Sequence, residues 1–348
     1  MKRKVLLITE YIDPPYDEGI KKTVFNLFKA LDKKFDLVVI CRYGFTKDNI
    51  YILKTNTLFI HEKVRTIIRE FKPEILLYFP MASMTFASYL RLFVFKKYTG
   101  RIKSIIIALQ PKVLSNWQKI IVGFIKPSVA LTPSILAKGY WDKLKINNKI
   151  FPLYTDLNDF RPLADKFMKN KLREKYNIPV DKFVISHMGH LNEGRNLESL
   201  IPLQDADNQV IVIGSSSTPK DSLGPYYLKQ KLLNSGIIII DRYLENINEI
   251  YQLSDLYVFP VINQCSSIGL PLSILEARAC GITVLTTEFG STKEYLGDDF
   301  GGIFYSNPID FMPVIQTIKD QDFSSLKTAI ADINDKYNQL IFSEIEDD

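Results

Sequence analysis

The chain has 348 residues, of which 46% are hydrophobic and 24% charged, so it is long enough for two globular domains and is not compositionally disordered. Its three cysteines form neither a CxxC pair nor a disulfide framework, which is typical of proteins from a reducing compartment such as the cytoplasm. Its three histidines make no zinc-binding pattern, and we expect no metal site and no separate cofactor.

The net charge of +5 is distributed unevenly along the chain. Residues 1–150 contain 27 Lys and Arg against 11 Asp and Glu, whereas residues 151–348 contain 17 against 28. No acidic residue occurs between Glu74 and Asp142. Such a basic half favours an anionic partner, either a membrane surface, a phosphorylated lipid or a nucleic acid, although a lysine-rich surface balanced by its acidic neighbour would give the same pattern.

In the first half of the chain, short apolar runs alternate with amphipathic stretches. The expected strands are Lys4–Thr9, Phe35–Cys41, Glu74–Tyr78, Ser104–Leu109 and Ser128–Leu131, and the expected helices are Lys21–Leu31 and Glu62–Phe71. The uncharged run from Ile75 to Leu90 has 16 residues and contains Pro80, so it is too short for a membrane span. The segment Tyr89–Tyr98 mixes aromatic with basic residues and fits either a membrane-facing patch or an amphipathic core helix.

The second half repeats this rhythm after a connection at Asn158–Pro162 and a charged helical segment at Lys166–Tyr176. The expected strands are Phe183–Met188, Val210–Gly214, Ile237–Ile240, Leu256–Pro260 and Thr283–Thr287. The expected helices are Leu197–Leu203, Tyr226–Leu233, Ile247–Leu253, Leu272–Ala279 and Ile309–Ile318. A last helical stretch, Leu326–Ile341, is compatible with a return onto the first domain.

Alternation of strands and helices predicts parallel sheets covered by helices on both faces. We therefore expect an α/β protein of two Rossmann-like, doubly wound domains, residues 1–162 and 163–325, that face a central cleft, with a C-terminal helix in 326–348. Neither domain has a G-x-G-x-x-G motif after its first strand, which argues against a nicotinamide cofactor.

The segment Ser266–Gly281 follows a predicted buried strand and opens a helix. Gly269 supplies a permissive backbone and Pro271 a pre-set helical φ, and the free amides at the helix start can hold a phosphate. Glu276 lies near the middle of an otherwise apolar helix, where a carboxylate needs a partner. Ribose hydroxyls would satisfy it, and so would a structural ion pair.

Residues 269–281, GLPLSILEARACG, closely resemble the signature of the family 4 retaining glycosyltransferases of the GT-B fold, commonly E-G-x-P-x-x-x-L-E-A-M-A-C-G. Flanking segments similar to the family's other motifs are Asp17–Ile20, Asp156–Pro162, Gly189–Asn196, Asp255–Pro260 and Glu288–Glu294. The resemblance therefore extends over nearly the whole chain. It implies an acceptor-side first domain and a nucleotide-sugar-binding second domain.

The resemblance also implies roles for single residues. Glu276 would bind the ribose of the nucleotide, and Arg195, at the position of the family's lysine, would stabilise the departing diphosphate together with His190. The other donor-binding residues that it implies are Gly19, Gly269, Leu270, Leu272 and Tyr243. The first glutamate of the family's E-x7-E pair is replaced by Ile268, and Asn263 or Gln264 are the nearby polar side chains that could take its place.

Taken together, these features predict a metal-independent, retaining hexosyltransferase that uses a nucleotide-diphosphate sugar and acts on a lipid or glycan acceptor. We expect a cytoplasmic protein with peripheral contact to the inner face of an anionic membrane through its basic first domain, and no nucleic-acid partner. Two alternatives stay open. The replacement at Ile268 fits a catalytically inactive nucleotide-sugar-binding or scaffold subunit, and a sugar-nucleotide epimerase can share the same fold.

Overall fold

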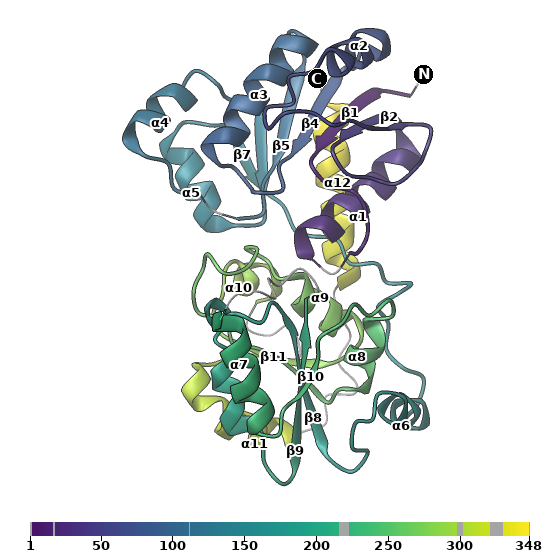
Figure 1. Ribbon diagram of the computed structural model, residues 1–348, viewed down its shortest axis with the longest axis vertical. Helices are drawn as coiled ribbons and strands as arrows, with labels where there is room; N and C mark the ends of the chain where they lie inside the picture. The colour runs from purple at the N-terminus through teal and green to yellow at the C-terminus, as the bar shows by residue number, and fades with distance from the viewer. Residues whose placement is uncertain are drawn as a thin grey trace. The chain divides into compact units, whose positions relative to one another are not determined.

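The computed structural model describes residues 2–16, 18–110, 112–215, 223–297, 302–320 and 330–347. The chain divides into two compact units. The first unit comprises Met1–Leu153, Ile268–Leu270 and Asp335–Asp348, and the second comprises Tyr154–Ser267 and Pro271–Asn334. Each unit is built on one parallel sheet with helices packed against it (Figure 1), which confirms the predicted α/β class.

The sheet of the first unit has seven strands in the order β3-β2-β1-β4-β5-β6-β7. Its strands are β1 (Lys4–Thr9), β2 (Asp36–Cys41), β3 (Ile50–Ile52), β4 (Ile75–Phe79), β5 (Lys103–Ile107), β6 (Val129–Thr132) and β7 (Asn148–Ile150). Its helices are α1 (Gly19–Lys34), α2 (Glu62–Phe71), α3 (Phe86–Thr99), α4 (Asn116–Val122) and α5 (Ile135–Lys143), and most of α12 (Ile330–Glu346) joins them.

The central strands of this sheet are apolar on both faces because helices cover both sides. β1 pairs in parallel with β2 and with β4, so that Val5 lies opposite Leu37 on one side and Ile75 on the other. Helix α3 buries Tyr89, Leu92 and Phe95. The segment Tyr89–Tyr98 therefore forms most of a helix that packs into the core, as one of the two interpretations predicted.

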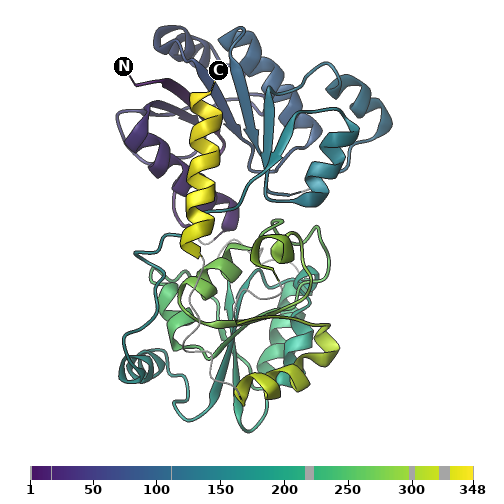
Figure 2. The same cartoon turned by 180° about the vertical axis from the view of Figure 1, so that it is seen from behind.

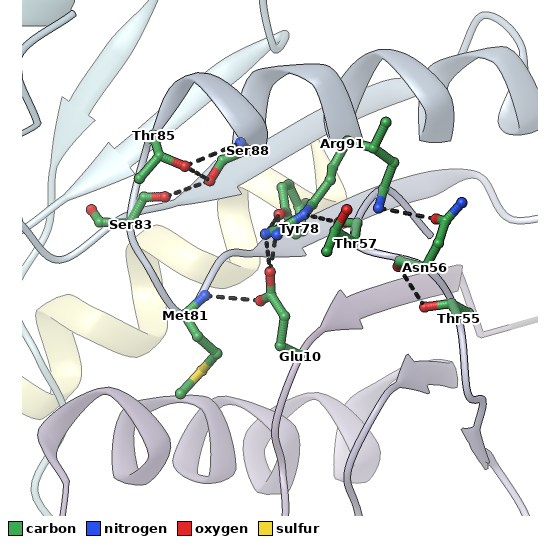
Figure 3. A network of polar contacts seen from close by, with 11 residues as sticks. Glu10, Thr55, Asn56, Thr57, Tyr78, Met81, Ser83, Thr85, Ser88 and Arg91 are labelled. Atoms are coloured by element: carbon green, nitrogen blue, oxygen red, sulfur yellow. Dashed lines mark hydrogen bonds and ion pairs between the residues drawn. The ribbon is translucent and has the colours of Figure 1, made fainter. Parts of the chain in front are cut away.

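A buried ion pair lies where β1 and β4 end, at the point where the strand order of the first sheet reverses (Figure 3). Arg91 of α3 donates from Nη1 to Glu10 Oε1, and its Nε donates to the Thr57 carbonyl over 2.6 Å. The other carboxylate oxygen of Glu10 accepts the Met81 backbone N–H at 2.9 Å. The pair thus fixes the loop after β4 against the end of β1.

The C-terminal helix α12 runs along the first unit (yellow in Figure 2). Arg3 donates to the Ile345 carbonyl over 2.8 Å, and the buried carboxylate of Glu344 pairs with Lys149 and, at 3.8 Å, with Lys103. These contacts join α12 to the residue that precedes β1 and to strands β5 and β7. Residues 321–329, which precede the helix, lie outside the described part of the chain.

The sheet of the second unit has six strands in the order β10-β9-β8-β11-β12-β13. Its strands are β8 (Phe183–Gly189), β9 (Asn208–Gly214), β10 (Ile238–Ile240), β11 (Leu256–Phe259), β12 (Thr283–Thr286) and β13 (Ile303–Tyr305). Its α-helices are α6 (Lys166–Lys175), α7 (Leu223–Asn234), α8 (Asn248–Leu253), α9 (Leu272–Ala279), α10 (Thr292–Leu296) and α11 (Phe311–Lys319), and three 3-10 turns, η1 (Glu193–Arg195), η2 (Leu197–Leu203) and η3 (Pro308–Asp310), complete it.

A hydrophobic core cluster of this unit forms where η2, α7 and α11 pack on the sheet. The predicted helix at Leu197–Leu203 is a 3-10 helix instead of an α-helix, and it contains Pro202, which has no N–H to donate within an α-helix. Arg173 of α6 is buried and donates to Asp255 at 2.6 Å and to three backbone carbonyls.

In the described ranges, no helix is both long and apolar enough to cross a membrane.

Candidate functional site

The strand order of the second sheet reverses between β8 and β11, because the chain passes from β8 to β9 and β10 and then returns to the other side of β8. In open parallel sheets, ligands bind beside the carboxyl ends of the strands at such a switch point. Here those ends are Gly189 and Phe259. The loop after Gly189 leads into η1, and the loop after Phe259 leads to α9.

These two loops meet through Arg195 at the end of η1. Its Nη1 donates to Ser267 Oγ over 3.2 Å. The loops also approach closely at Gly194, where an added Cβ would lie 2.5 Å from Ser266 Oγ. Burial lowers the pKa of Arg195, and its interaction with Tyr257 partly opposes this. A guanidinium nevertheless keeps its proton at neutral pH. The site therefore presents a fixed, partly buried positive charge.

His187, near the end of β8, lies beside this arginine. Its Nδ1 is 2.9 Å from the Val258 carbonyl oxygen, and because a carbonyl only accepts, Nδ1 carries the proton and Nε2 is an acceptor. Burial lowers the pKa of His187 to about 4, and the Arg195 charge acts in the same direction while the Val258 hydrogen bond opposes it. The imidazole is therefore neutral at physiological pH.

Gly189 separates the two side chains, and a Cβ there would lie 3.2 Å from His187 Nε2 and 3.5 Å from Arg195 Nη1. Within the part of the chain that the structure describes, neither His187 Nε2 nor Arg195 Nε has a hydrogen-bond partner. Buried polar atoms are nearly always paired in native proteins, so unpaired ones at a switch point indicate a ligand-binding site.

The side chain of Glu276, on α9, is buried, with an exposed fraction of 5%. Tyr251 of α8 donates its hydroxyl to Glu276 Oε2 over 2.8 Å, which orients the carboxylate. The pKa of Tyr251 is raised well above its usual value by burial first and by the Glu276 charge second. The ring centroid of Tyr257, on β11, lies 5.6 Å from that of Tyr251. The Tyr257 hydroxyl also interacts electrostatically with both Arg195 and Glu276.

The predicted site residues fall in both units. Gly19, the first residue of α1, belongs to the first unit, as do Gly269 and Leu270, whereas Arg195, His190, Glu276, Leu272 and Tyr243 belong to the second. Leu272 is the buried first residue of α9. His190 lies in the loop after β8, and Tyr243 is 44% exposed in the loop after β10. Sequence reasoning missed Ser267, His187 and the two tyrosines as members of the site.

Asn263 and Gln264, the polar residues considered as replacements for the missing glutamate, both accept backbone hydrogen bonds. Asn263 Oδ1 accepts the Cys265 N–H at 3.0 Å, and Gln264 Oε1 accepts the Gly290 N–H at 2.8 Å. Ile268 itself is buried. Among the described residues, no group of three or more His, Cys, Asp or Glu side chains is placed to hold a metal ion. Part of the glycine loop, Asp17, lies outside the described residues.

Residues 168–324, which include this switch point, match the family described as glycosyl transferases group 1. The chain contains a glycosyl transferases group 1 domain, and its two parallel sheets form a GT-B fold. The matched residues include η1 and α9, so the charged switch point of the second sheet lies within this domain.

Solved structures show the same fold over nearly the full chain. HepE of Anabaena in complex with UDP-glucose has a TM-score of 0.77 and 13% identity, covering 99% of this chain and 98% of HepE. Sucrose-phosphate synthase of Thermosynechococcus elongatus has a TM-score of 0.70 and 14% identity, covering 98% and 95%.

A curated relative is N,N'-diacetylbacillosaminyl-diphospho-undecaprenol alpha-1,3-N-acetylgalactosaminyltransferase of Campylobacter jejuni subsp. jejuni. It is 26% identical over 156 residues, which are 45% of this chain and 37% of the relative. The match therefore spans little more than a third of that glycosyltransferase.

Proposed function

We propose that this chain transfers a hexose or N-acetylhexosamine from a nucleotide-diphosphate sugar to a lipid-linked glycan. The observation that carries the proposal is the charged guanidinium of Arg195, held by Ser267 at the switch point of a glycosyl transferases group 1 domain. A diphosphate leaving group requires positive charge where its negative charge develops. Arg195 supplies that charge from the protein itself, which supports transfer without a metal ion.

In the proposed reaction the acceptor hydroxyl oxygen forms a bond to the anomeric carbon while the bond between that carbon and the diphosphate oxygen breaks. The acceptor proton passes to the departing diphosphate, and the sugar keeps its anomeric configuration. Arg195 stabilises the negative charge of the departing diphosphate, together with His190 of the same loop. Glu276, oriented by Tyr251, accepts hydrogen bonds from the ribose hydroxyls. Gly19, Gly269, Leu270, Leu272 and Tyr243 remain the proposed further donor contacts.

The relatives support a particular choice of substrates. HepE was solved with UDP-glucose, and the Campylobacter enzyme is named for an acceptor linked to diphospho-undecaprenol. We therefore propose a UDP-sugar as donor and a polyprenyl-diphosphate-linked saccharide as acceptor, with action at an anionic membrane surface, toward which the basic first half of the chain would turn.

The test is nucleotide release by the purified chain in the presence of single UDP-sugars and a polyprenyl-diphosphate-linked saccharide. We expect UDP formation that depends on both substrates, persists in a chelator, and yields a product with the donor's anomeric configuration. Inhibition by the chelator would contradict the metal-independent step, and an inverted product would contradict retention.

A second candidate rests on the buried Ile268 at the position of the family's first glutamate. An apolar side chain there removes a carboxylate beside the donor sugar, so the chain would bind the nucleotide sugar without consuming it. This binding-only role predicts a thermal shift with UDP-sugars, no UDP release with any acceptor, and recovery of turnover in an Ile268→Glu variant.

A further inference from the structure

Helix α4 of the first unit (Figure 1) and the residues that flank it expose several apolar side chains. The exposed fractions are 73% for Val113, 57% for Trp117, 68% for Ile120, 37% for Ile121 and 87% for Phe124. Trp117, Ile120, Ile121 and Phe124 have the spacing i, i+3, i+4, i+7 that normally turns a helical stripe toward a core. Here that stripe faces solvent.

The exposed stripe is held in place by a well-formed local structure. A capping box of Ser115 and Gln118 fixes the start of the helix, and the Trp117 ring packs edge-on against Phe86 at 5.0 Å between centroids. On the opposite side Val122 is fully buried in the core. The apolar side chains are therefore presented by a packed element rather than by a loose segment.

The charged side chains in the segment that carries the stripe are all basic. Lys112 and Lys119 are exposed within the same segment. No acidic residue occurs between Glu74 and Asp142, and Asp142 pairs with Lys138 at 2.7 Å. A second copy of the chain docking on the same surface would bring like charges together, whereas an anionic partner is complementary.

We propose that this α4 surface, formed by Val113, Trp117, Ile120, Ile121 and Phe124 with Lys112 and Lys119, docks on an anionic lipid bilayer. The apolar stripe enters the boundary between headgroups and acyl chains, and the lysines bind the headgroup phosphates. The inference deepens the proposed function, since it places the basic unit where a lipid-linked acceptor resides. Binding to vesicles that contain no acceptor tests it separately.

The experiment is co-sedimentation of the full chain with vesicles containing about one third phosphatidylglycerol, and with pure phosphatidylcholine. We expect binding to the anionic vesicles that is at least about tenfold tighter than to the neutral ones and weakens with salt. The double variant Ile120→Ser/Phe124→Ser should lose at least about tenfold in affinity with an unchanged thermal midpoint, because both side chains are exposed. The matched control Ile309→Ser, which alters an 85% exposed isoleucine of the second unit, should bind like the wild type.

Tryptophan fluorescence gives an independent readout, because the chain has two tryptophans and Trp141 is buried while Trp117 is exposed. Anionic vesicles should shift the emission to shorter wavelength in the wild type. The double variant Lys112→Gln/Lys119→Gln provides a second test in case the apolar variant misfolds. It should bind anionic vesicles more weakly than the wild type does.

Equal vesicle binding by both double variants and the wild type would overturn the proposal, as would absence of binding. Conversion of a wild-type dimer to a monomer by Ile120→Ser/Phe124→Ser would assign the surface to contacts between copies. Vesicle binding without nucleotide-sugar turnover would instead count against the proposed function and leave the docking surface intact.

Discussion

Arg195 Nη1 lies 3.2 Å from Ser267 Oγ, so one hydrogen bond joins the loop after β8 to the segment before α9. Replacing Arg195 by Gln should lower kcat for UDP release by about 10²–10³, the range found when one preorganised group that stabilises developing charge is removed. The Ser267→Ala variant should lose less, because the guanidinium keeps its charge. The exposed Lys171→Gln variant serves as the control for loss of a positive charge. Equal rates for the Arg195→Gln variant and the wild type would exclude this role.

Glu276 and Tyr251 make a second testable pair. The Glu276→Ala variant should weaken UDP binding by more than about tenfold, since hydrogen bonds to a charged group contribute about 1.5–3 kcal/mol each. The Tyr251→Phe variant removes the donor that orients the carboxylate and should cost about 1–3 kcal/mol of stability with a smaller loss of affinity. Isothermal titration with UDP and thermal unfolding measure the two effects. Unchanged UDP affinity in the Glu276→Ala variant would move the nucleotide site elsewhere.

We expect the free energy of unfolding to depend on pH because the pKa of His187 differs between the folded and the unfolded chain. Its folded-state pKa of about 4 is below the unfolded value of 6.5, so the unfolded chain takes up a proton first as the pH falls. Above pH 6.5 the neutral imidazole makes its full contribution to the free energy of unfolding, and this contribution decreases as the pH falls from 6.5 to 4. About 2 kcal/mol of it is lost at pH 5. Calorimetry at pH 7.5 and 5 should show a smaller loss for His187→Asn than for the wild type. The same loss in both would mean that other groups titrate.

We expect the ion pair of Glu10 and Arg91 to contribute to the stability of the first unit (Figure 3). The Arg91→Met variant leaves a buried carboxylate without its cation and should destabilise this unit by about 3–5 kcal/mol. Both tryptophans belong to the first unit, so tryptophan fluorescence during denaturation follows this unit alone. The exposed pair of Lys138 and Asp142 is the control, and Lys138→Gln should cost less than about 1 kcal/mol. Equal midpoints for both variants would contradict the account.

The strands and core helices were predictable because long apolar runs between turn signals identify buried elements in parallel sheets. The predicted strand Lys4–Thr9 and the predicted helices Glu62–Phe71 and Leu272–Ala279 agree with the structure at both ends. The edge strands β3 and β7 were not predicted, because each has only three residues and is partly exposed, and β7 has no apolar run. Helix α4 was also missed, since its apolar stripe does not contribute to the core.

The site was only partly predictable. Arg195 and Glu276 could be selected because they match family motifs at fixed spacing. Ser267, Tyr251 and His187 contribute through partners that are distant in sequence, such as the Val258 carbonyl, and no local pattern reveals such pairs. A polar residue inside an apolar strand, as His187 is in β8, was the one signal available.

We propose that sugar transfer from a nucleotide sugar depends on Arg195 and Glu276. The most direct measurement is UDP release from UDP-sugars with a polyprenyl-diphosphate-linked saccharide, compared between the wild type and the Arg195→Gln and Glu276→Ala variants. The account predicts acceptor-dependent release by the wild type and a loss of at least about 10²-fold in Arg195→Gln. Saturable UDP-sugar binding by the wild type with no UDP released, or release unaffected by either substitution, would contradict it.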